Sequence, residues 1–327
     1  MNSNPHPLVS VIAPFHNSRD YLVDFLKNWQ DIRVNSRYEI QLILVDDHST
    51  DDYLAYLSKA ELSTALFIEN EMEPGAGPAR NAGLKKATGE YVYFVDVDDF
   101  VNRETFLDLL NSVQNELSEK IDIYSFGFTS IDYETKSTIY VSENKFSGIF
   151  KRESSDKLIA MLFENGQPYN VWNKLYRRSF LTQGNFTFPN AKVAQDALFN
   201  LDVLTKVETV KILDVHIYQY LVGRPESNTN KKNSKFSDEK KLVFMLEQIF
   251  PLDSYGIVAA EATRIAMKEI RYLMSSGNFE SQSFELYKFS NHFTFKGLQG
   301  VKVKMLLKNK LVRRIYSFLV QRKALNK

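Results

Sequence analysis

The sequence predicts an α/β fold with a mostly parallel central sheet, followed by a helical C-terminal region. Apolar runs of strand length alternate with amphipathic segments along the first part of the chain, which is the pattern of βαβ units. Two of these runs end in pairs of aspartates, and ligands bind beyond the carboxyl ends of strands in such sheets. A hydrophobic content of 44% over 327 residues is enough for a sizeable core.

The expected elements follow from hydrophobic periodicity. Continuous apolar runs predict buried strands over 8–14, 40–45, 66–68 and 91–95. After the first run, Ser18 is the expected N-cap of a helix whose apolar face includes Leu22, Phe25 and Trp29. A Gly/Pro loop at 74–78 precedes a helix over 79–87. Further along, a helix is expected at 103–120, a strand at 121–126, short antiparallel pieces at 137–141 and 148–151, a helix from 194, and strands within 209–221.

A change of composition at 230–234, rich in Asn, Lys and Ser, marks a linker or exposed loop. We therefore expect a catalytic domain over residues 1–230 and a helical, basic region over 231–327. The helical patterns in the second region fall at 240–250, 254–275 and 302–320.

Composition also limits the chemistry and the compartment. The chain has no cysteine, which excludes disulfides and thiolate catalysis. The first residues show no apolar leader, and no apolar stretch reaches the length of a membrane span, so we expect a cytoplasmic protein. Charge is unevenly distributed, because eleven basic and no acidic residues follow Glu285.

The most informative stretch is 90–99, where a buried strand ends in Asp96, Asp98 and Asp99. Asp96 and Asp98 share a strand parity, so both can point to one side. Carboxylates this close repel each other, and a divalent cation with hard oxygen ligands such as Mg²⁺ or Mn²⁺ relieves the repulsion. An acidic turn that caps the next helix is the alternative.

Six motifs together resemble the family 2 glycosyltransferases of GT-A fold. They are SVIAPFHN at 10–17, LVDDHSTD at 44–51, GPARNAG at 77–83, FVDVDD at 94–99, NKLY at 173–176 and QDALFN at 195–200. The resemblance covers roughly residues 8–229, and it is specific because the motifs occur together and in order. It implies an inverting, metal-dependent hexosyl- or N-acetylhexosaminyl-transferase. Such an enzyme would move a sugar from a UDP-sugar to a glycan or lipid-linked acceptor in cell-surface polysaccharide synthesis.

The resemblance also assigns roles residue by residue. Asp196 would be the catalytic base. The nucleotide-sugar site would include Pro14, His16, Asp46, Arg80, Asp96, Arg224 and Ser227, with Asp46 on the uracil or ribose, Arg80 near the base, and Arg224 and Ser227 over the diphosphate. Asp98, together with Asp96, would ligate Mn²⁺ or Mg²⁺, and Trp172 and Lys174 would lie near the acceptor.

Elementary chemistry agrees with these roles and leaves alternatives open. A cation on Asp98 would neutralise the leaving diphosphate, and Asp196 at a helix start would deprotonate the acceptor, with its pKa lowered by the helix N-terminus. Asp196 can also be a plain N-cap, Trp172 a core residue and Lys174 a solvated one. Two residues depart from the family pattern: His16 stands where Tyr is usual, and Gln195 where an acidic residue is usual.

The basic tail suggests a partner of its own. Val301, Met305, Val312, Ile315 and Leu319 recur at helical spacing with Lys and Arg around them, which favours an amphipathic helix on an anionic membrane surface. We therefore expect attachment to the inner face of the plasma membrane. Docking on the catalytic domain or on another subunit of a homo-oligomer is the alternative, and nucleic acid is not expected because no aromatic–basic platform accompanies the charge.

Two other functions compete with sugar transfer. One is a catalytically inactive GT-A scaffold, which the intact Asp96, Asp98 and Asp196 argue against. The other is a nucleotidyltransferase, but its usual glycine-rich phosphate loop is missing after the first strand, where Pro14-Phe15-His16-Asn17 stands instead.

Overall fold

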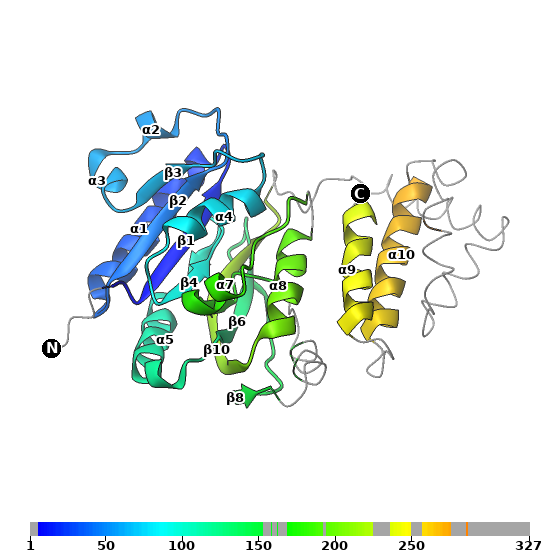
Figure 1. The fold of residues 1–327 in the computed structure, drawn as a ribbon. Helices are drawn as coiled ribbons and strands as arrows, with labels where there is room; N and C mark the ends of the chain where they lie inside the picture. Colours follow the sequence, from blue (N-terminus) through cyan, green and yellow to red (C-terminus); the bar gives the residue numbers. More distant parts are fainter. Residues whose placement is uncertain are drawn as a thin grey trace. The chain divides into compact units, whose positions relative to one another are not determined.

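The computed structural model describes residues 6–152, 158, 162, 169–191, 194–224, 236–249, 257–275 and 286. The chain divides into two compact units, residues 1–225 and residues 226–327, and each is described by itself. The first unit is a layered α/β structure in which helices cover a central sheet (Figure 1). The predicted fold class, including the helices that follow the α/β part, is therefore confirmed.

One half of the sheet is parallel and carries the predicted strands. Its spatial order is β3 (Leu66–Glu69), β2 (Ile40–Asp46), β1 (Val9–Phe15) and β4 (Tyr91–Phe94). All seven residues of β1 and all four of β4 are buried, because helices cover both faces. In the register, Phe15 pairs with Asp46 and Ile12 with Phe94, so β1, β2 and β4 reach the same edge of the sheet.

The other half of the sheet is mixed. Beyond β4 the order continues with β9 (Lys174–Arg177), β6 (Ile123–Asp132), β10 (Thr209–Val222) and β5 (Phe100–Val101), while β7 (Thr138–Val141) pairs with β6 and β8 (Gly148–Lys151) with β10. β9 runs antiparallel to both β4 and β6, whereas β10 is parallel to β6. β9 therefore joins the parallel half to the β6–β10 pair and carries Lys174 into the interior.

Helices cover both faces of the sheet. Those that the structure describes in full in the first unit are α1 (Arg19–Asn35), α2 (Tyr53–Tyr56), α3 (Lys59–Leu62), α4 (Ala76–Lys86), α5 (Arg103–Asn115), the 3-10 helix η1 (Leu117–Glu119), α7 (Arg178–Gln183) and α8 (Gln195–Lys206). On one face, Trp29 of α1 packs edge-on against Phe106 of α5 and Tyr93 of β4. On the other face, Gly83 lets α4 approach β1, because a side chain at that position would collide with Ile12.

Some predicted element bounds were wrong. α4 begins at Ala76 inside the expected Gly/Pro loop, with Gly75 as its N-cap at φ 150°, a value that glycine adopts readily. The helix expected to reach residue 120 ends at Asn115, and the strands expected within 209–221 form the single strand β10. Ser18 occupies the N-cap position of α1, but its hydroxyl donates to the carbonyl of His16 instead of capping the helix.

The described part of the second unit consists of α9 (Phe236–Ile249) and α10 (Ile257–Ser275), with Leu286 beyond them. The two helices contact each other, and their buried apolar residues include Leu242, Leu246, Ile265 and Ile270. The predicted helix at 302–320 and the basic tail lie outside the described residues. Among the described helices, none has the length and apolar character needed to cross a bilayer.

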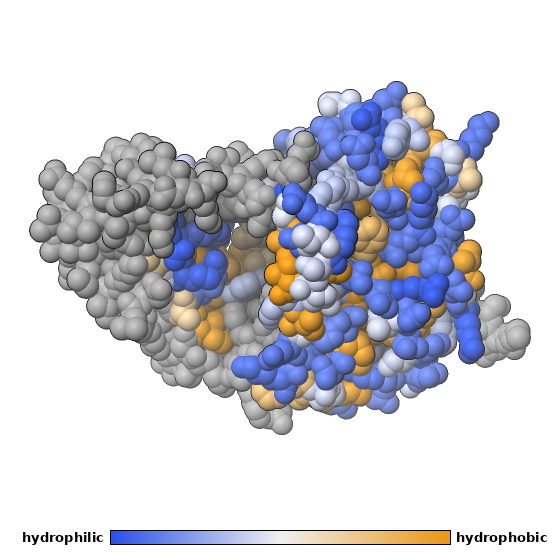
Figure 2. Space-filling model, turned by 180° about the vertical axis from the view of Figure 1, so that it is seen from behind, coloured by the Kyte–Doolittle hydropathy of each residue, from blue (hydrophilic) through white to orange (hydrophobic). Residues whose placement is uncertain are grey.

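The surface of the first unit is mainly polar on the face turned away from the viewer in Figure 1. Figure 2 shows hydrophilic residues covering most of that face, with hydrophobic residues in smaller groups among them. The large apolar side chains of the first unit lie mostly in its core instead, between the sheet and the helices.

Candidate active site

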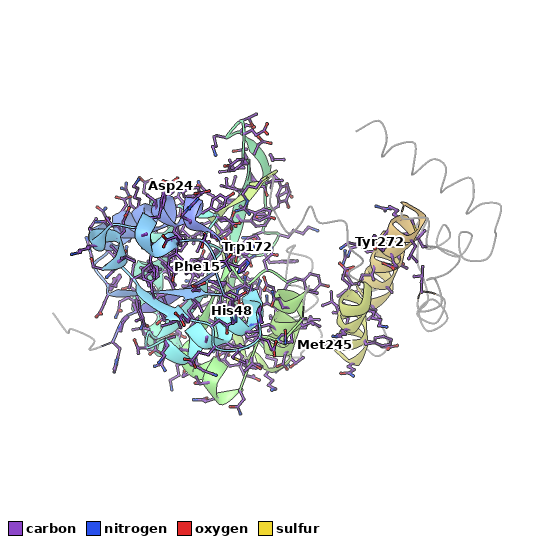
Figure 3. The ribbon with its side chains drawn as sticks, turned by 90° about the horizontal axis from the view of Figure 1, so that it is seen from above. Phe15, Asp24, His48, Trp172, Met245 and Tyr272 are labelled. Carbon is purple, nitrogen blue, oxygen red and sulfur yellow. The ribbon has the colours of Figure 1, made fainter. Side chains whose placement is uncertain are left out.

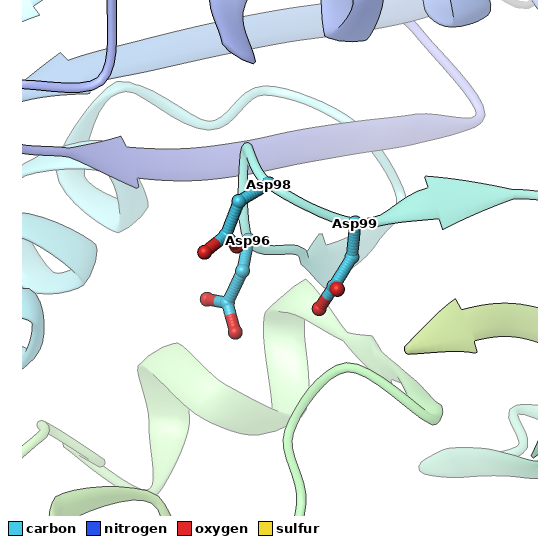
Figure 4. A group of neighbouring side chains, drawn as sticks. All are labelled: Asp96, Asp98 and Asp99. Carbon is cyan, nitrogen blue, oxygen red and sulfur yellow. The ribbon is translucent and has the colours of Figure 1, made fainter. Parts of the chain in front are cut away.

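Three carboxylates gather where β4 ends. Asp96, Asp98 and Asp99 each offer an oxygen atom, and these atoms lie within 4.8 Å of one another (Figure 4). The chain turns here, because the N–H of Asp99 donates to the carbonyl of Asp96 at 3.2 Å. This turn, and not the pleat of a strand, brings Asp96 and Asp98 to one side, since β4 ends at Phe94.

Asp99 differs from its two neighbours. Its carboxylate is buried and accepts hydrogen bonds from the Tyr218 hydroxyl and the Leu221 N–H, both at 2.8 Å. Asp99 therefore ties the acidic turn to β10, while Asp96 and Asp98 stay partly exposed with side chains 33% and 32% accessible. The sequence analysis counted Asp99 in the acidic run but assigned it no role, because its partners on β10 are distant in the chain.

The cluster carries more negative charge than its surroundings balance. Burial, together with repulsion from Asp96, raises the pKa of Asp98 to about 6. Burial and the neighbouring Asp98 and Asp96 raise the pKa of Asp99 well above its usual range. Carboxylate oxygens in surplus are the ligands that Mg²⁺ and Mn²⁺ prefer, so the residues present fit a divalent cation.

Arg224 supplies part of the missing positive charge. It follows the end of β10, is buried, forms an ion pair with the Asp98 carboxylate, and donates to the Asp98 carbonyl at 2.9 Å. Its guanidinium also lies 4.0 Å from Asp99. The structure thus brings Arg224 to the predicted metal ligands, whereas Ser227 lies outside the described residues.

Arg80 joins the acidic cluster to Asp196. The Nη2 atom of Arg80 donates to Asp96 Oδ1 at 2.8 Å and its Nη1 atom to Asp196 Oδ1 at 2.5 Å. The Arg80 side chain is only 4% exposed. From the sequence we expected Arg80 near the nucleotide base, and we did not predict that it bridges α4 and α8.

Asp196 lies in the first turn of α8 and is not its N-cap, because Ala194 holds that position in a left-handed conformation. The expectation that the helix start lowers the pKa of Asp196 was wrong. Burial raises this pKa, and Asp96 raises it further, while Arg80 and Lys174 lower it. Desolvation is therefore the largest influence on this pKa, and the nearby cations compensate part of it.

A second group of polar residues surrounds the ends of β1 and β2. The Asp46 carboxylate accepts the N–H of Ser49 at 2.8 Å, and the ring Nδ1 of His16 bonds to the carbonyl of Asp47 at 2.7 Å. Pro14 pairs with Val45 in the register between these strands. The predicted residues Pro14, His16 and Asp46 thus lie at the same edge of the sheet as the acidic turn.

Asp47 organises this second group. It is buried and accepts from the Asn70 side chain at 2.7 Å and from the Gly75 N–H at 2.8 Å. These bonds connect the end of β2 to the segment that leads into α4. Sequence reasoning singled out Asp46 alone, although the adjacent carboxylate was an equal candidate.

Trp172 and Lys174 are buried and not exposed at the rim of a site. Trp172 is 7% accessible and lies among the strands of the first unit (Figure 3). It stacks on Tyr218 with ring centroids 4.5 Å apart and planes at 11°, and on Tyr220 at 5.7 Å. Phe128 meets the same ring edge-on at 4.9 Å, so Trp172 is a core residue, and its contact with the acceptor stays a prediction.

Lys174 is 1% accessible, and its amine donates to the Asn170 carbonyl at 2.6 Å and to Asn173 Oδ1 at 2.8 Å. Burial lowers its pKa to about 7, an effect that Asp196 partly opposes. Lys174 is therefore a buried residue and not a surface one, and its charged form lowers the pKa of Asp196.

Comparison with known proteins agrees with the geometry. The family described as glycosyl transferase family 2 matches residues 10–183. The glycosyltransferase EpsJ of Bacillus subtilis, which is described as uncharacterized, is 28% identical over 259 residues, covering 78% of this chain and 72% of EpsJ. The poly(ribitol-phosphate) β-N-acetylglucosaminyltransferase TarS of Staphylococcus aureus is 28% identical over 223 residues, covering 66% of this chain but only 35% of TarS.

Solved structures show the same fold. Residues 1–349 of S. aureus TarS in complex with UDP-GlcNAc align with a TM-score of 0.60 at 20% identity, covering 96% of this chain and 89% of that one. The same TarS fragment without that ligand aligns with a TM-score of 0.58. At this identity the likeness establishes the GT-A fold, and the chain spans about a third of full-length TarS.

Proposed function

We propose that this chain, which belongs to glycosyl transferase family 2, moves a sugar from a UDP-sugar to a hydroxyl group of a glycan or lipid-linked acceptor, with inversion at the transferred carbon. That it is a glycosyltransferase follows from the family match. The donor, the stereochemistry, the cation and the acceptor are the proposal. A hexosyl or N-acetylhexosaminyl group is the proposed cargo, in line with the sugar named for TarS.

One observation carries the proposal. The Arg80 guanidinium donates to both Asp196 and Asp96. The partly exposed Asp196 carboxylate is therefore separated from the acidic cluster by only the Arg80 side chain. An inverting transfer needs a base on the acceptor side and charge compensation on the leaving-group side, facing each other across the anomeric carbon. Asp196 can supply the base, and the acidic cluster at the end of β4, with a bound cation, can supply the charge compensation.

In this mechanism Asp196 accepts the proton of the acceptor hydroxyl as the oxygen attacks the anomeric carbon. Arg80 occupies Oδ1 of Asp196, which leaves Oδ2 for that proton. The bond between the anomeric carbon and the donor phosphate breaks on the opposite face, and its electron pair leaves with UDP. Arg224, which pairs with Asp98 at the acidic turn, is the proposed contact of the diphosphate oxygens.

Asp98 and Asp96 are the proposed ligands of Mn²⁺ or Mg²⁺, because Asp99 is occupied by Tyr218 and Leu221. When bound, the cation would neutralise charge on the departing diphosphate. Asp46, His16 and Pro14 are the proposed contacts of the uridine, since they lie at the ends of β1 and β2 beside the acidic turn.

A screen of nucleotide-sugars tests the function. The purified chain is incubated with Mn²⁺ and a panel that includes UDP-GlcNAc, UDP-glucose and GDP-mannose, and nucleotide release is measured. We expect release from a UDP-sugar, with Asp196→Asn as the matched inactive control. No release from any donor by the wild-type protein, at a concentration where UDP binds, would instead favour the inactive scaffold. Release of pyrophosphate from a sugar phosphate and UTP would favour a nucleotidyltransferase.

Attachment to an anionic membrane is proposed for the basic tail, with the enzyme at the inner face of the plasma membrane. The support is the run of eleven basic residues after Glu285 at helical spacing with apolar ones. Flotation with phosphatidylglycerol vesicles, comparing the full chain with one truncated before Lys296, tests it. Equal binding by both chains, or none at low salt, would reject membrane attachment. Light scattering on the same samples tests the predicted homo-oligomer.

A further inference from the structure

We propose that Arg80 is a positioning residue of the transfer reaction: its single guanidinium holds Asp196 beside Asp96, pairs with the negative charge of the base and leaves one Asp196 oxygen for the acceptor. The inference rests on the proposed function, because it takes Asp196 as the base. It concerns Arg80 itself, which the resemblance had placed near the nucleotide base.

The burial of the three side chains shows how the bridge is built. The Arg80 side chain is 4% exposed, whereas those of Asp196 and Asp96 are 29% and 33% exposed. The guanidinium therefore lies beneath two carboxylates that open toward the surface. Each carboxylate uses its Oδ1 atom for Arg80. A buried cation with charges on two sides cannot turn away without leaving one of them uncompensated.

Neighbouring contacts fix the separation between Arg80 and Asp196. Asn81, the next residue on α4, exchanges two hydrogen bonds with the backbone of Phe188, at 2.9 and 2.8 Å. The Phe188 ring lies 5.4 Å from the Arg80 guanidinium and stacks at 3.9 Å on Phe199 of α8. α4 and α8 are thus joined beside the ion pair, so the base is held in place before any ligand arrives.

The charges around Asp196 explain what Arg80 is needed for. Burial and Asp96 raise the pKa of Asp196, and Arg80 is the larger of the two cationic influences that lower it. The other is Lys174, whose own pKa is lowered to about 7, so it carries only part of a charge at neutral pH. The Tyr176 hydroxyl, bonded to Asn200, stays neutral because burial raises its pKa. Without Arg80, Asp196 would shift toward the protonated form, which cannot act as a base.

A direct titration of Asp196 tests the inference. The full chain is labelled with [γ-¹³C]aspartate, and the Asp196 resonance is assigned by its loss in Asp196→Asn. We expect the midpoint of this resonance to rise by about one pH unit or more in Arg80→Met, and by less in Arg80→Lys, which keeps the charge. An unchanged midpoint in Arg80→Met would overturn the proposal. Should that variant not fold, Arg80→Gln, also neutral, takes its place under the same criterion.

Arg177→Met is the matched control. Arg177 also pairs with a buried aspartate, Asp122, but at the start of β4, where it is the register partner of Tyr91. It should destabilise the protein without moving the Asp196 midpoint, and an equal shift in this variant would show that the effect on Asp196 is not specific to Arg80. Because the titration uses no donor, its result is independent of the nucleotide-sugar screen. Where transfer is detected, the acid limb of kcat should shift by the same amount in Arg80→Met.

Discussion

Two clusters of arginine and aspartate lie at opposite ends of the strands of the same sheet. They differ in how completely the arginines balance the negative charge of the aspartates. At the start of β6, Asp122 is buried and pairs with Arg177 through one oxygen. Its other oxygen accepts the N–H groups of Glu208 and Thr209 at 2.9 and 3.0 Å. One carboxylate meets one guanidinium, and both its oxygens are occupied.

At the carboxyl edge, four carboxylates share two guanidinium groups. Asp96 and Asp196 share Arg80, while Asp98 and Asp99 share Arg224. The pKa values of Asp98, Asp99 and Asp196 are all raised, with burial as the largest cause in each case. A balanced cluster stabilises the fold, whereas a surplus of buried negative charge at a strand end marks a place for a cation and for proton transfer.

The largest effects are expected when one aspartate of each cluster is replaced by alanine. Asp98→Ala should abolish transfer with Mn²⁺ saturating, while the free energy of unfolding changes by less than about 1 kcal/mol, because surplus negative charge is removed and Arg224 keeps Asp99 nearby. Asp122→Ala should lower the free energy of unfolding by about 3 kcal/mol, because Arg177 loses its buried partner. Urea unfolding and donor turnover on both variants measure this, and near wild-type turnover of Asp98→Ala would reject its assignment as a metal ligand.

Asp196→Asn tests the other half of the carboxyl edge. The change is nearly isosteric, but an amide cannot accept the proton, so transfer should fall by roughly two to four orders of magnitude. Binding of UDP, measured by calorimetry, should persist because the proposed uridine contacts Pro14, His16 and Asp46 lie at the ends of β1 and β2. Normal transfer by this variant would mean that another residue is the base.

The buried amine of Lys174 should make the free energy of unfolding depend on pH. Burial lowers its pKa from an ordinary value of 10.5 to about 7. Between these values the unfolded chain binds one more proton than the folded protein, so the free energy of unfolding should rise with pH, by at most about 1.4 kcal/mol per unit. Lys174→Met should remove this slope between pH 7 and 9, and the exposed control Lys86→Met should retain it. Equal slopes in Lys174→Met and wild type would contradict the lowered pKa of the buried Lys174 amine.

The smallest effect is expected at Asp46. If its carboxylate contacts the uridine, Asp46→Ala should weaken UDP binding five- to tenfold, about 1 kcal/mol for one hydrogen bond. Calorimetry measures the affinity, and Asp20→Ala, which removes an exposed carboxylate of α1, is the control. Unchanged affinity for UDP would exclude Asp46 from the nucleotide site.

The strands and the acidic turn could be predicted because their signals are local. An apolar run followed at once by Asp96, Asp98 and Asp99 specifies both a buried strand and a charged end, whatever surrounds it. The start of α4 was misplaced by the same local reasoning, because Gly75 and Pro78 were read as a loop although Gly75 is the N-cap and Pro78 lies in the first turn.

The electrostatics of the site could not be predicted, since they depend on partners distant in the chain. Arg80 and Asp196 are 116 positions apart, and Asp99 meets Tyr218 at a separation of 119. Lys174 has an ordinary lysine sequence context, and only the antiparallel placement of β9 between β4 and β6 explains its burial. The sign of the Asp196 pKa shift was therefore wrong from sequence, because burial is a property of the assembled fold.

The stacking of Trp172 on Tyr218, which is bonded to the acidic turn, makes the intrinsic fluorescence of the protein a probe of ligand binding. The chain has two tryptophans, and Trp29 lies on the α1 face, packed against Tyr93 and Phe106. Trp172 instead stacks on Tyr218, whose hydroxyl donates to Asp99 and accepts the N–H of Asp96. With Trp29 replaced by Phe, the emission of Trp172 alone should report ligand arrival at the turn, so binding can be followed by fluorescence in a stopped-flow instrument without labelling the donor.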